Sequence, residues 1–142
     1  MKKTFSFIII IIILVFAGMQ YANAQKTVVV PFIEEECDCP GLAEFIYRVD
    51  IEVIDQCGED HYTIYADFQF VSQSPATFAL QRFCNNTSNE ECYLLVAAVS
   101  KFCSDGNGGY TEVCSGKYEG DHYSCPFLMS SGTIIIPTIT ID

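Results

Sequence analysis

Two histidines are the residues best suited to metal binding or proton transfer, and both occur in the same tripeptide. Asp60-His61-Tyr62 and Asp121-His122-Tyr123 each follow a turn containing Gly and Glu and open a predicted strand. Imidazole is a common metal ligand and proton shuttle, so a fold that joins the two motifs could make a metal or acid–base site. No third group stands at metal-ligand spacing beside either motif. We therefore expect the Gly, Glu and Asp residues to form turns and His-Tyr to begin the next strand.

Cysteine is the other residue type that could do chemistry, and all eight cysteines follow residue 24: Cys37, Cys39, Cys57, Cys84, Cys92, Cys103, Cys114 and Cys125. An even number in an exported chain predicts disulfides, and eight cysteines allow 105 connectivities. A four-cysteine zinc site needs Cys-x₂-Cys pairs, whereas the closest pair here is Cys37-Asp38-Cys39. These two point to opposite faces of an extended segment, so we expect them to bond two different partners. Cys57 lies in a predicted loop tip and should tie that tip to another element.

The sequence alone does not determine which cysteines pair in the disulfides. Cys92, Cys103, Cys114 and Cys125 recur every eleven residues. In a meander of strands, Cys103 with Cys114, Cys92 with Cys125, or Cys114 with Cys125 could be bridged if their Cα atoms come within about 7 Å. Cys84 and Cys92 also flank the polar loop 85–91 and could close it.

Calcium is the metal that the carboxylate-rich segments would favour. Asp105-Gly106-Asn107-Gly108-Gly109 with Glu112 partly matches a calcium loop, but it lacks the first aspartates and the twelve-residue frame. A glycine-rich hairpin turn is the better explanation. The acids within residues 34–38 form a second cluster, and acidic runs are usually solvated. We expect no cofactor, with calcium as the weak remaining candidate.

Catalytic motifs are absent from the sequence. There is no G-x-S-x-G elbow, no P-loop and no dinucleotide fingerprint. Cysteines in disulfides leave no thiol nucleophile. These observations favour a protein without enzymatic activity.

Three tyrosines lie in or beside the turns of the last third of the chain: Tyr110, Tyr118 and Tyr123. A tyrosine has a flat face and a polar tip, which suits a sugar- or protein-binding surface. Partly buried packing is the more common role of tyrosine in a β protein.

The first 24 residues predict a secretory signal peptide. Lys2 and Lys3 precede the apolar run 7–17, and Ala22-Asn23-Ala24 is an A-x-A cleavage site. The apolar run is shorter than the roughly 20 residues that a membrane-spanning helix needs. We expect a secreted, periplasmic or otherwise extracellular protein, with residues 25–142 as one domain and no membrane span after cleavage.

The predicted mature chain is strongly acidic. Removal of Lys2 and Lys3 leaves five basic residues against 18 acidic ones, a formal net charge of −13. Nucleic acid and anionic membrane surfaces both require cations and are disfavoured as partners. A basic protein or calcium is compatible with this charge, although solubility alone would explain it.

The clearest structural pattern is a predicted hairpin around the loop 56–61. Its two apolar faces are Phe45, Tyr47, Val49, Ile51 and Val53 on one strand, and Tyr62, Ile64, Ala66, Phe68 and Phe70 on the other. Pairing Val53 with Tyr62 brings these two faces together and places Arg48 opposite Asp67. A slip of one residue would expose an apolar face, so we expect this register to be firmly set.

Two later segments could be strand or helix. Ser74 and Pro75 match a helix start, which leaves residues 76–84 ambiguous. In residues 92–103, a capping box before the segment and Lys101 near its end favour a helix. The continuous apolar run and the neighbouring strands favour a strand buried on both faces, and we expect the strand.

The two ends of the chain carry similar segments. Residues 27–31 and 133–137 both read Thr, three β-branched residues, Pro. Pro31 cannot donate a backbone hydrogen bond, so the first segment should lie at a sheet edge. These β-prone ends could close the sheet, or they could add strands to a neighbouring copy.

Together these patterns predict a mainly β fold, a disulfide-stabilised two-layer antiparallel sandwich with room for one or two short helices within residues 75–103. An α+β fold is the alternative. The expected function is a secreted, non-enzymatic binding protein that presents loops and turns to an extracellular protein or glycan. The alternatives are a structural subunit of an extracellular assembly or filament that joins copies through its end strands, and a small secreted hydrolase or toxin that uses His61 or His122. Such features occur in many unrelated secreted domains, and a fold does not fix a function.

Overall fold

The computed structural model describes residues 25–41 and 43–142, and in these residues the chain forms nine strands and one short helix. In chain order they are β1 (Lys26–Val30), β2 (Phe32–Glu34), β3 (Phe45–Asp55), β4 (Tyr62–Val71), β5 (Ala76–Ala79), β6 (Tyr93–Ser104), β7 (Tyr110–Tyr123), α2 (Cys125–Leu128), β8 (Gly132–Ile135) and β9 (Ile139–Ile141). The predicted mainly β class is confirmed. The predicted signal peptide, residues 1–24, lies outside the described residues.

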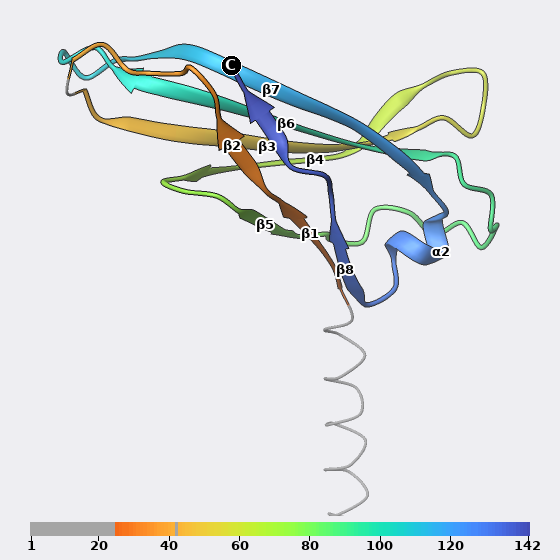
Figure 1. The fold of residues 1–142 in the computed structure, drawn as a ribbon. Coiled ribbons are helices and arrows are strands. Elements are labelled where there is room, and N and C mark those ends of the chain that lie inside the picture. The colour runs from red at the N-terminus through yellow and green to blue at the C-terminus, as the bar shows by residue number, and fades with distance from the viewer. Residues whose placement is uncertain (1–24, 42) are drawn as a thin grey trace, which may run out of the picture.

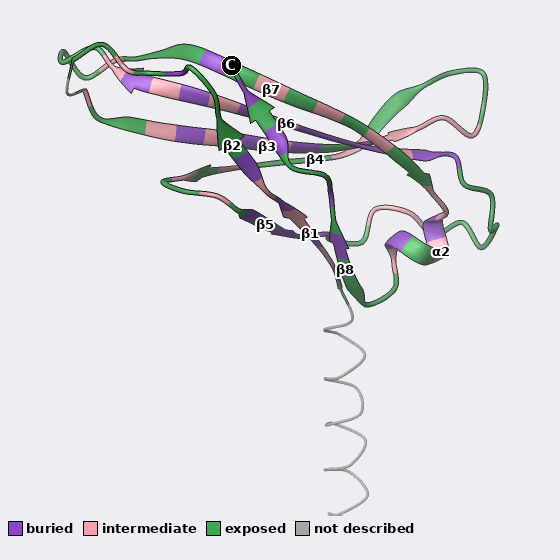
Figure 2. Ribbon diagram, in the orientation of Figure 1, coloured by how far each residue is buried: buried purple, intermediate pink, exposed green. Residues whose placement is uncertain are grey.

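The first layer is a four-stranded antiparallel sheet in the order β4, β3, β6, β7. Its strands are long, from 10 residues in β4 to 14 in β7, and Figure 1 shows them running side by side. Buried and less buried residues alternate along β3 and β6 (Figure 2), because successive side chains of a strand point to opposite faces. One face of this sheet therefore forms half of the core.

The second layer is built largely from the two ends of the chain. β1 lies between β5 and β8, and β2 pairs with β9. β1 runs antiparallel to β5 but parallel to β8, and β2 runs parallel to β9. The predicted antiparallel sandwich is confirmed for the four-stranded sheet, and this second layer combines antiparallel with parallel pairs. Parallel neighbours need a long crossover connection, and here the whole first layer supplies it.

The two similar end segments are partners in this layer. Thr27 pairs with Thr133, so the two Thr-initiated segments lie in matching register. The pairing continues beyond Pro31 and Pro137, since Ile139 donates its N–H to the Pro31 carbonyl at 2.9 Å. β1 is therefore central in its sheet, and the expectation of an edge strand is wrong. Pro31 follows β1 directly, at the junction with β2, where its missing N–H breaks no β1 pairing.

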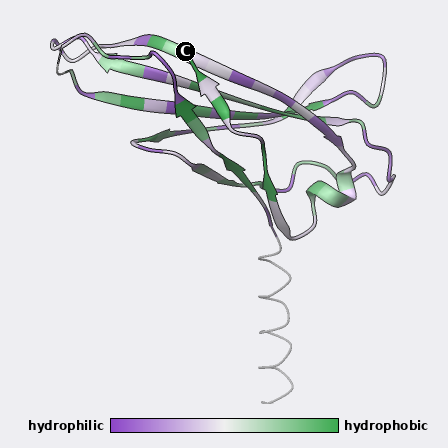
Figure 3. Ribbon diagram, in the orientation of Figure 1, coloured by the Kyte–Doolittle hydropathy of each residue, from purple (hydrophilic) through white to green (hydrophobic). Residues whose placement is uncertain are grey.

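The core lies between the two layers. Its fully buried aliphatic and aromatic side chains include Val49, Ile51, Val53, Leu95 and Val99 from the first layer, and Val28, Val30, Phe78 and Ile141 from the second. Hydrophobic residues mark most of β1 and β8 in Figure 3. Each such side chain contributes about 1.5–3 kcal/mol relative to its exposed state.

The pairing of β3 with β4 differs from the predicted hairpin. Val53 lies opposite Tyr65 instead of Tyr62, and Arg48 lies opposite Phe70 instead of Asp67. Phe68 and Phe70, which were expected to complete the hydrophobic face of β4, therefore point away from the core, whereas Ile64, beyond the register shift, still packs against it. Phe68 and Phe70 are 52% and 56% exposed.

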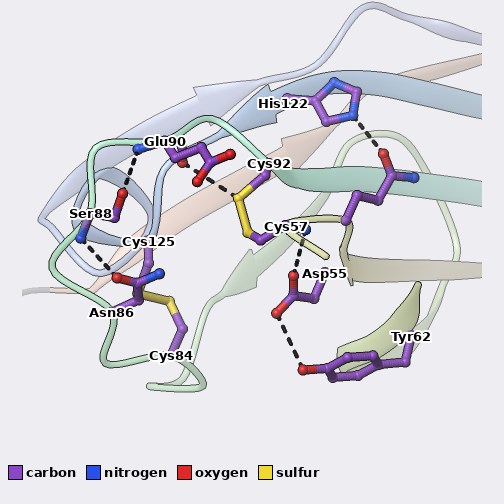
Figure 4. Close-up of a disulfide and its surroundings, with 11 residues drawn as sticks. Asp55, Cys57, Tyr62, Cys84, Asn86, Ser88, Glu90, Cys92, His122 and Cys125 are labelled. Carbon is purple, nitrogen blue, oxygen red and sulfur yellow. Dashed lines mark hydrogen bonds between the residues drawn. A yellow bond between two sulfur atoms is a disulfide. The ribbon is translucent and has the colours of Figure 1, made fainter. Parts of the chain in front are cut away.

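The loop after β3 holds the end of β3 against β6. Cys57 is disulfide-bonded to Cys92, and Gln56 donates its N–H to the Cys92 carbonyl at 2.9 Å. Asp55 accepts the Cys57 N–H at 2.9 Å (Figure 4). The β3–β4 register also shifts just after Val53, the sign of a bulge. The observed β3–β4 pairing is therefore a register that hydrophobic pairing alone does not select.

Both ambiguous segments contain strands. Residues 75–103 hold β5 and most of β6 and no helix, so the predicted strand at 92–103 is confirmed and the allowance for short helices there is wrong. β6 pairs with β3 on one side and β7 on the other, and this tertiary pairing outweighs local helix signals. The short helix α2 follows β7 instead, with Ser124 capping its N-terminus and Pro126 in its first turn.

Four disulfides join Cys37 to Cys114, Cys39 to Cys103, Cys57 to Cys92 and Cys84 to Cys125. The predictions that Cys37 and Cys39 take different partners, and that Cys57 ties its loop to another element, are confirmed. Disulfides of this number fit an oxidising environment. No helix of the described chain has the length and hydrophobicity needed to cross a membrane.

The bridges considered between Cys84 and Cys92, and within the eleven-residue series, do not form. In the β6–β7 register, Cys103 lies opposite Thr111 and Cys114 lies opposite Lys101, so these two cysteines do not face each other. Each instead meets a cysteine of the segment between β2 and β3. The spacing along the chain therefore carries no information about the pairing.

Gly116 marks a point where the two layers come very close. It lies on β7 opposite the buried Val99. A β-carbon built at this position would stand 2.2 Å from the backbone oxygen of Thr140 in β9. The crossing of β9 over β7 therefore needs a residue without a side chain.

Gly116→Ala should lower the free energy of unfolding by about 2 kcal/mol or more, because the added methyl group pushes the β9 backbone away from β7. This corresponds to a fall in melting temperature of roughly 8 °C. Gly58→Ala is the matched control, since an added β-carbon there meets no atom within 4 Å. Thermal unfolding followed by circular dichroism would measure both variants, and equal melting temperatures would contradict the packing described for Gly116.

Candidate functional site

The outer face of the four-stranded sheet carries large apolar side chains, and the second layer packs on the opposite face. Two adjacent rows across β4, β3, β6 and β7 read Phe70, Arg48, Ser100 and Ser115, and then Phe68, Asp50, Ala98 and Lys117. Residues that lie opposite each other on neighbouring strands point to the same face. Both rows therefore face away from the core.

Six side chains at one end of this face form a continuous group that we call the outer aromatic face: Ile46, Arg48, Phe68, Phe70, Phe102 and Tyr110. All but Phe68 line a shallow depression of about 400 Å³. Phe68 packs edge-on against Phe70, with 5.8 Å between ring centroids. Phe68, Phe70 and Tyr110 are each more than half exposed. Contiguous apolar surface of this kind on a folded protein commonly marks an interaction site.

Arg48 is the charged member of this face. Its guanidinium lies 4.8 Å from the centre of the Phe68 ring. Its Nη2 and Nε donate to one carboxylate oxygen of Asp50 at 2.7 and 3.0 Å. A surface ion pair of this type adds little stability, but the two contacts together hold the guanidinium over the ring. Arg48 is therefore held between Asp50 and Phe68 within the outer aromatic face.

Sequence reasoning missed this surface because it assigned Phe68 and Phe70 to the core. The residues of β4 that share a face with the buried side of β3 are Tyr65, Asp67, Gln69 and Val71. The opposite layer covers little of β4, since β5 has only four residues. Polar groups are tolerated there, and Gln69 donates its Nε2 to the Thr77 carbonyl at 2.9 Å. On β3, the polar residues that alternate with the buried ones, Arg48 among them, correctly indicated which side of that strand faces outward.

The three tyrosines of the last third divide between packing and surface. Tyr118 and Tyr123 are partly buried against the core, and Tyr123 stacks on Phe127 with 5.2 Å between centroids. Tyr110 belongs to the outer aromatic face and is 52% exposed.

The two Asp-His-Tyr motifs lie at the same end of the four-stranded sheet but on its two outer strands. Their tyrosines, Tyr62 and Tyr123, are separated by Asp55 of β3 and Tyr93 of β6. Three strand spacings correspond to about 14 Å. His122 lies with its Nε2 2.8 Å from Oε1 of Gln56 (Figure 4), and both histidines are exposed. The fold does not bring the two motifs into one site.

In the first calcium candidate, the Asp105 carboxylate stabilises its own turn. Asp105 accepts the backbone N–H groups of Asn107 and Gly109 at 2.8 and 2.9 Å, and these bonds lower the pKa of its carboxyl. Glu112 lies on β7 opposite Phe102, outside that turn. Across residues 25–41 and 43–142, no group of three or more His, Cys, Asp or Glu side chains is arranged to hold a metal ion.

The acidic segment of residues 34–38 supplies one member of a polar cluster at the edge of the core. Lys101, only 4% exposed, donates its Nζ to Glu34 at 2.6 Å and to the Cys37 carbonyl at 2.7 Å. Tyr47 also donates its hydroxyl to Glu34. The cluster joins β2 to β3 and β6.

The pKa values of the Glu34 carboxyl and the Tyr47 hydroxyl are both shifted from their ordinary values. Burial by itself raises the pKa of Glu34, but the hydrogen bonds from Lys101 and Tyr47 and the charge of Lys101 outweigh burial, and the pKa lies below its usual value. Burial raises the pKa of Tyr47, and the hydrogen bond to Glu34 and its charge raise it further. Glu34 is therefore held as a carboxylate by its partners, which suits a structural role.

All eight cysteines are in disulfides, and Glu34 is bound by Lys101 and Tyr47. The chain matches no protein-family model, and the comparisons find no similar curated protein and no similar solved structure. The outer aromatic face is thus the feature that points most directly to a function.

Glu34→Gln should make the protein less stable at neutral pH and less sensitive to acid. The folded-state pKa of Glu34 is lowered, so the unfolded chain takes up a proton at higher pH than the folded one. The stability that the carboxylate provides is present above its unfolded pKa of about 4.5 and is lost as pH falls through the folded pKa. We expect a loss of about 1–2 kcal/mol at pH 7, a modest figure because the Glu34 side chain is 28% exposed.

Melting temperatures between pH 7 and pH 3 would measure this effect. The difference between wild type and Glu34→Gln should shrink as the pH falls. Glu59→Gln, which removes an exposed loop carboxylate, should follow the wild-type profile. A constant difference between wild type and Glu34→Gln across this range would refute the role assigned to the carboxylate.

Proposed function

We propose that the protein is a secreted, non-enzymatic interaction protein that binds an extracellular protein partner through the outer aromatic face. The observation that carries this proposal is the exposure of Phe68, Phe70 and Tyr110 beside a shallow depression on an ordered sheet. Exposed apolar side chains cost solubility, and a folded protein that retains a cluster of them commonly uses it for binding.

The composition of this face supports a protein partner. Aromatic residues and arginine are enriched at the centres of protein interfaces, where a few side chains supply most of the affinity. A glycan site needs free polar groups beside its aromatic rings. On this face Arg48 already bonds Asp50, and four of the other five members are Ile or Phe, without hydrogen-bonding side chains.

The rigidity of the sheet also supports this proposal. The four strands are paired along most of their lengths, and three of the four disulfides join β6 or β7, or residues flanking β6, to loops. A surface that is already ordered loses less conformational entropy on binding. Secretion fits the signal peptide predicted for residues 1–24 and the four disulfides.

A structural subunit is the second candidate, and one observation favours it. β8 pairs with β1 on one side, and Ile135 of β8 is 70% exposed. A strand from a second copy could pair with the free side of β8. The N-terminal strand is less available for this purpose, because β1 already lies between β5 and β8.

Two variants separate these functions, and each is the control for the other. Phe68→Ser/Phe70→Ser removes two exposed rings of the outer aromatic face, and Ile135→Ser removes the exposed side chain of β8. The double variant should lose capture of partner proteins from the source's own extracellular fluid, by tenfold or more in affinity once a captured protein is purified. Ile135→Ser should bind that protein like wild type. All three forms should keep the same circular dichroism spectrum.

Light scattering over a concentration series tests the second candidate in the same samples. A monomer at every concentration, together with loss of partner binding in the double variant, supports the interaction protein. A native mass that increases with protein concentration in the wild type but not in Ile135→Ser would favour the structural subunit. Undiminished partner binding by Phe68→Ser/Phe70→Ser would refute the assignment of binding to the outer aromatic face.

A further inference from the structure

The outer face of the four-stranded sheet has an uneven charge pattern. Its two cations are each neutralised by an acid two residues further along the same strand: Arg48 bonds Asp50, and Lys117 bonds Glu119. These pairs leave the cations unavailable to a partner's acids without breaking an existing contact. The charges that remain free on this face are therefore those of its other acids.

Glu52 and Glu112 are the two remaining acids within the strands of this face, and Glu44 directly precedes β3, where its carbonyl accepts the Ser104 N–H. Glu52 lies on β3 opposite Val96, and Glu112 lies on β7 opposite Phe102. Both are exposed, and neither forms an ion pair with any residue of the described chain. The direct path between them crosses β6 near Ala98 and Ser100 and passes beside Arg48 and Phe102, whereas Phe68 and Phe70 lie on β4, on the far side of β3.

The spacing of these acids follows from the sheet geometry. Glu52 is six residues along β3 from Ile46, and Ile46 lies opposite Phe102, which lies opposite Glu112. Six residues of strand and two strand spacings place the two acids about 20 Å apart. An extended peptide covers this distance in about six residues. Alternate side chains of such a peptide would point at the sheet between its ends.

We propose that the outer aromatic face recognises an extended segment of a basic protein, with two Lys or Arg side chains about six residues apart and apolar side chains between them. This inference rests on the proposed function and adds the chemistry of the partner. The apolar side chains lie over Ala98 and Ser100, against Phe102 and the Arg48 stem at the border of the depression, and the two cations meet Glu52 and Glu112. Opposite charges at the rim of an apolar contact set specificity and the rate of association.

The charge of the whole chain selects a basic partner over a second copy of this protein. The predicted mature chain has a formal net charge of −13, with five basic and 18 acidic residues. Two copies that meet through this face would each bring unpaired Glu52 and Glu112 to the interface. Like charges in an interface oppose association, whereas a cationic segment is attracted from a distance.

A synthetic peptide tests this proposal directly. The probe is acetyl-Lys-Ser-Leu-Ser-Leu-Ser-Lys-amide, titrated to millimolar concentration into isotopically labelled full mature chain and followed by nuclear magnetic resonance. Chemical-shift changes should concentrate at the backbone amides of β3, β6 and β7 between Glu52 and Glu112. Glu52→Gln/Glu112→Gln should weaken binding about two- to tenfold at low salt, as expected for the loss of two exposed ion pairs. The same peptide with Glu in place of both Lys should bind the wild-type protein no more tightly than the Lys peptide binds Glu52→Gln/Glu112→Gln.

Glu59→Gln/Glu90→Gln is the matched control, because it removes two exposed acids from loops outside this face and changes the net charge equally. Equal weakening in both double variants, or equal binding of the Lys and Glu peptides, would overturn the basic-segment proposal. If Phe68→Ser/Phe70→Ser still abolished binding in that case, the apolar site of the proposed function would stand. Chemical-shift changes located elsewhere, or no changes, would overturn the inference. The partner-capture experiment would then test the proposed function separately. Dimerisation that Phe68→Ser/Phe70→Ser abolishes would assign the face to a second copy instead.

Discussion

The parallel pairing of the two chain ends is the contact on which the rest of the structure depends. It buries seven apolar side chains of β1, β2, β8, β9 and the residue after β8: Val28, Val30, Phe32, Ile134, Ile136, Ile139 and Ile141. At about 1.5–3 kcal/mol each, their burial contributes on the order of 10–20 kcal/mol as an upper estimate. Domains of this size have a net stability of about 5–15 kcal/mol. Without this layer, the apolar face of the four-stranded sheet would be open to water.

Several specific contacts fasten this layer to the first. Disulfides from Cys37 and Cys39 reach β7 and β6, and Lys101 on β6 bonds Glu34 at the end of β2. Gly116 lets the β9 backbone lie directly on β7. These contacts lie on one side of the four-stranded sheet, so its other face stays uncovered and rigid. An ordered sheet face of this kind can hold aromatic side chains in place for a partner.

The candidate surface follows from where the second layer ends. β5 is short, and β4 extends past it, so the inner side of β4 carries mixed residues while its phenylalanines point outward. The alternation along β4 was visible in the sequence, but the choice of buried side was not. Alternation shows that a strand has two different faces, and packing against another layer decides which face is buried. A surface built from Phe68 and Phe70 was therefore not predictable from the segment itself.

The sequence by itself determined the properties that depend on neighbouring residues: the mainly β class, the separate partners of Cys37 and Cys39, and the anchoring of the Cys57 loop. These follow from side-chain alternation and from local geometry. The tertiary structure decided the register of β4, the disulfide connectivity, the parallel pairing of Thr27 with Thr133, and the open face of the sheet. Each of these depends on contacts between segments far apart in the chain, and the pattern within one segment fits several such arrangements equally well.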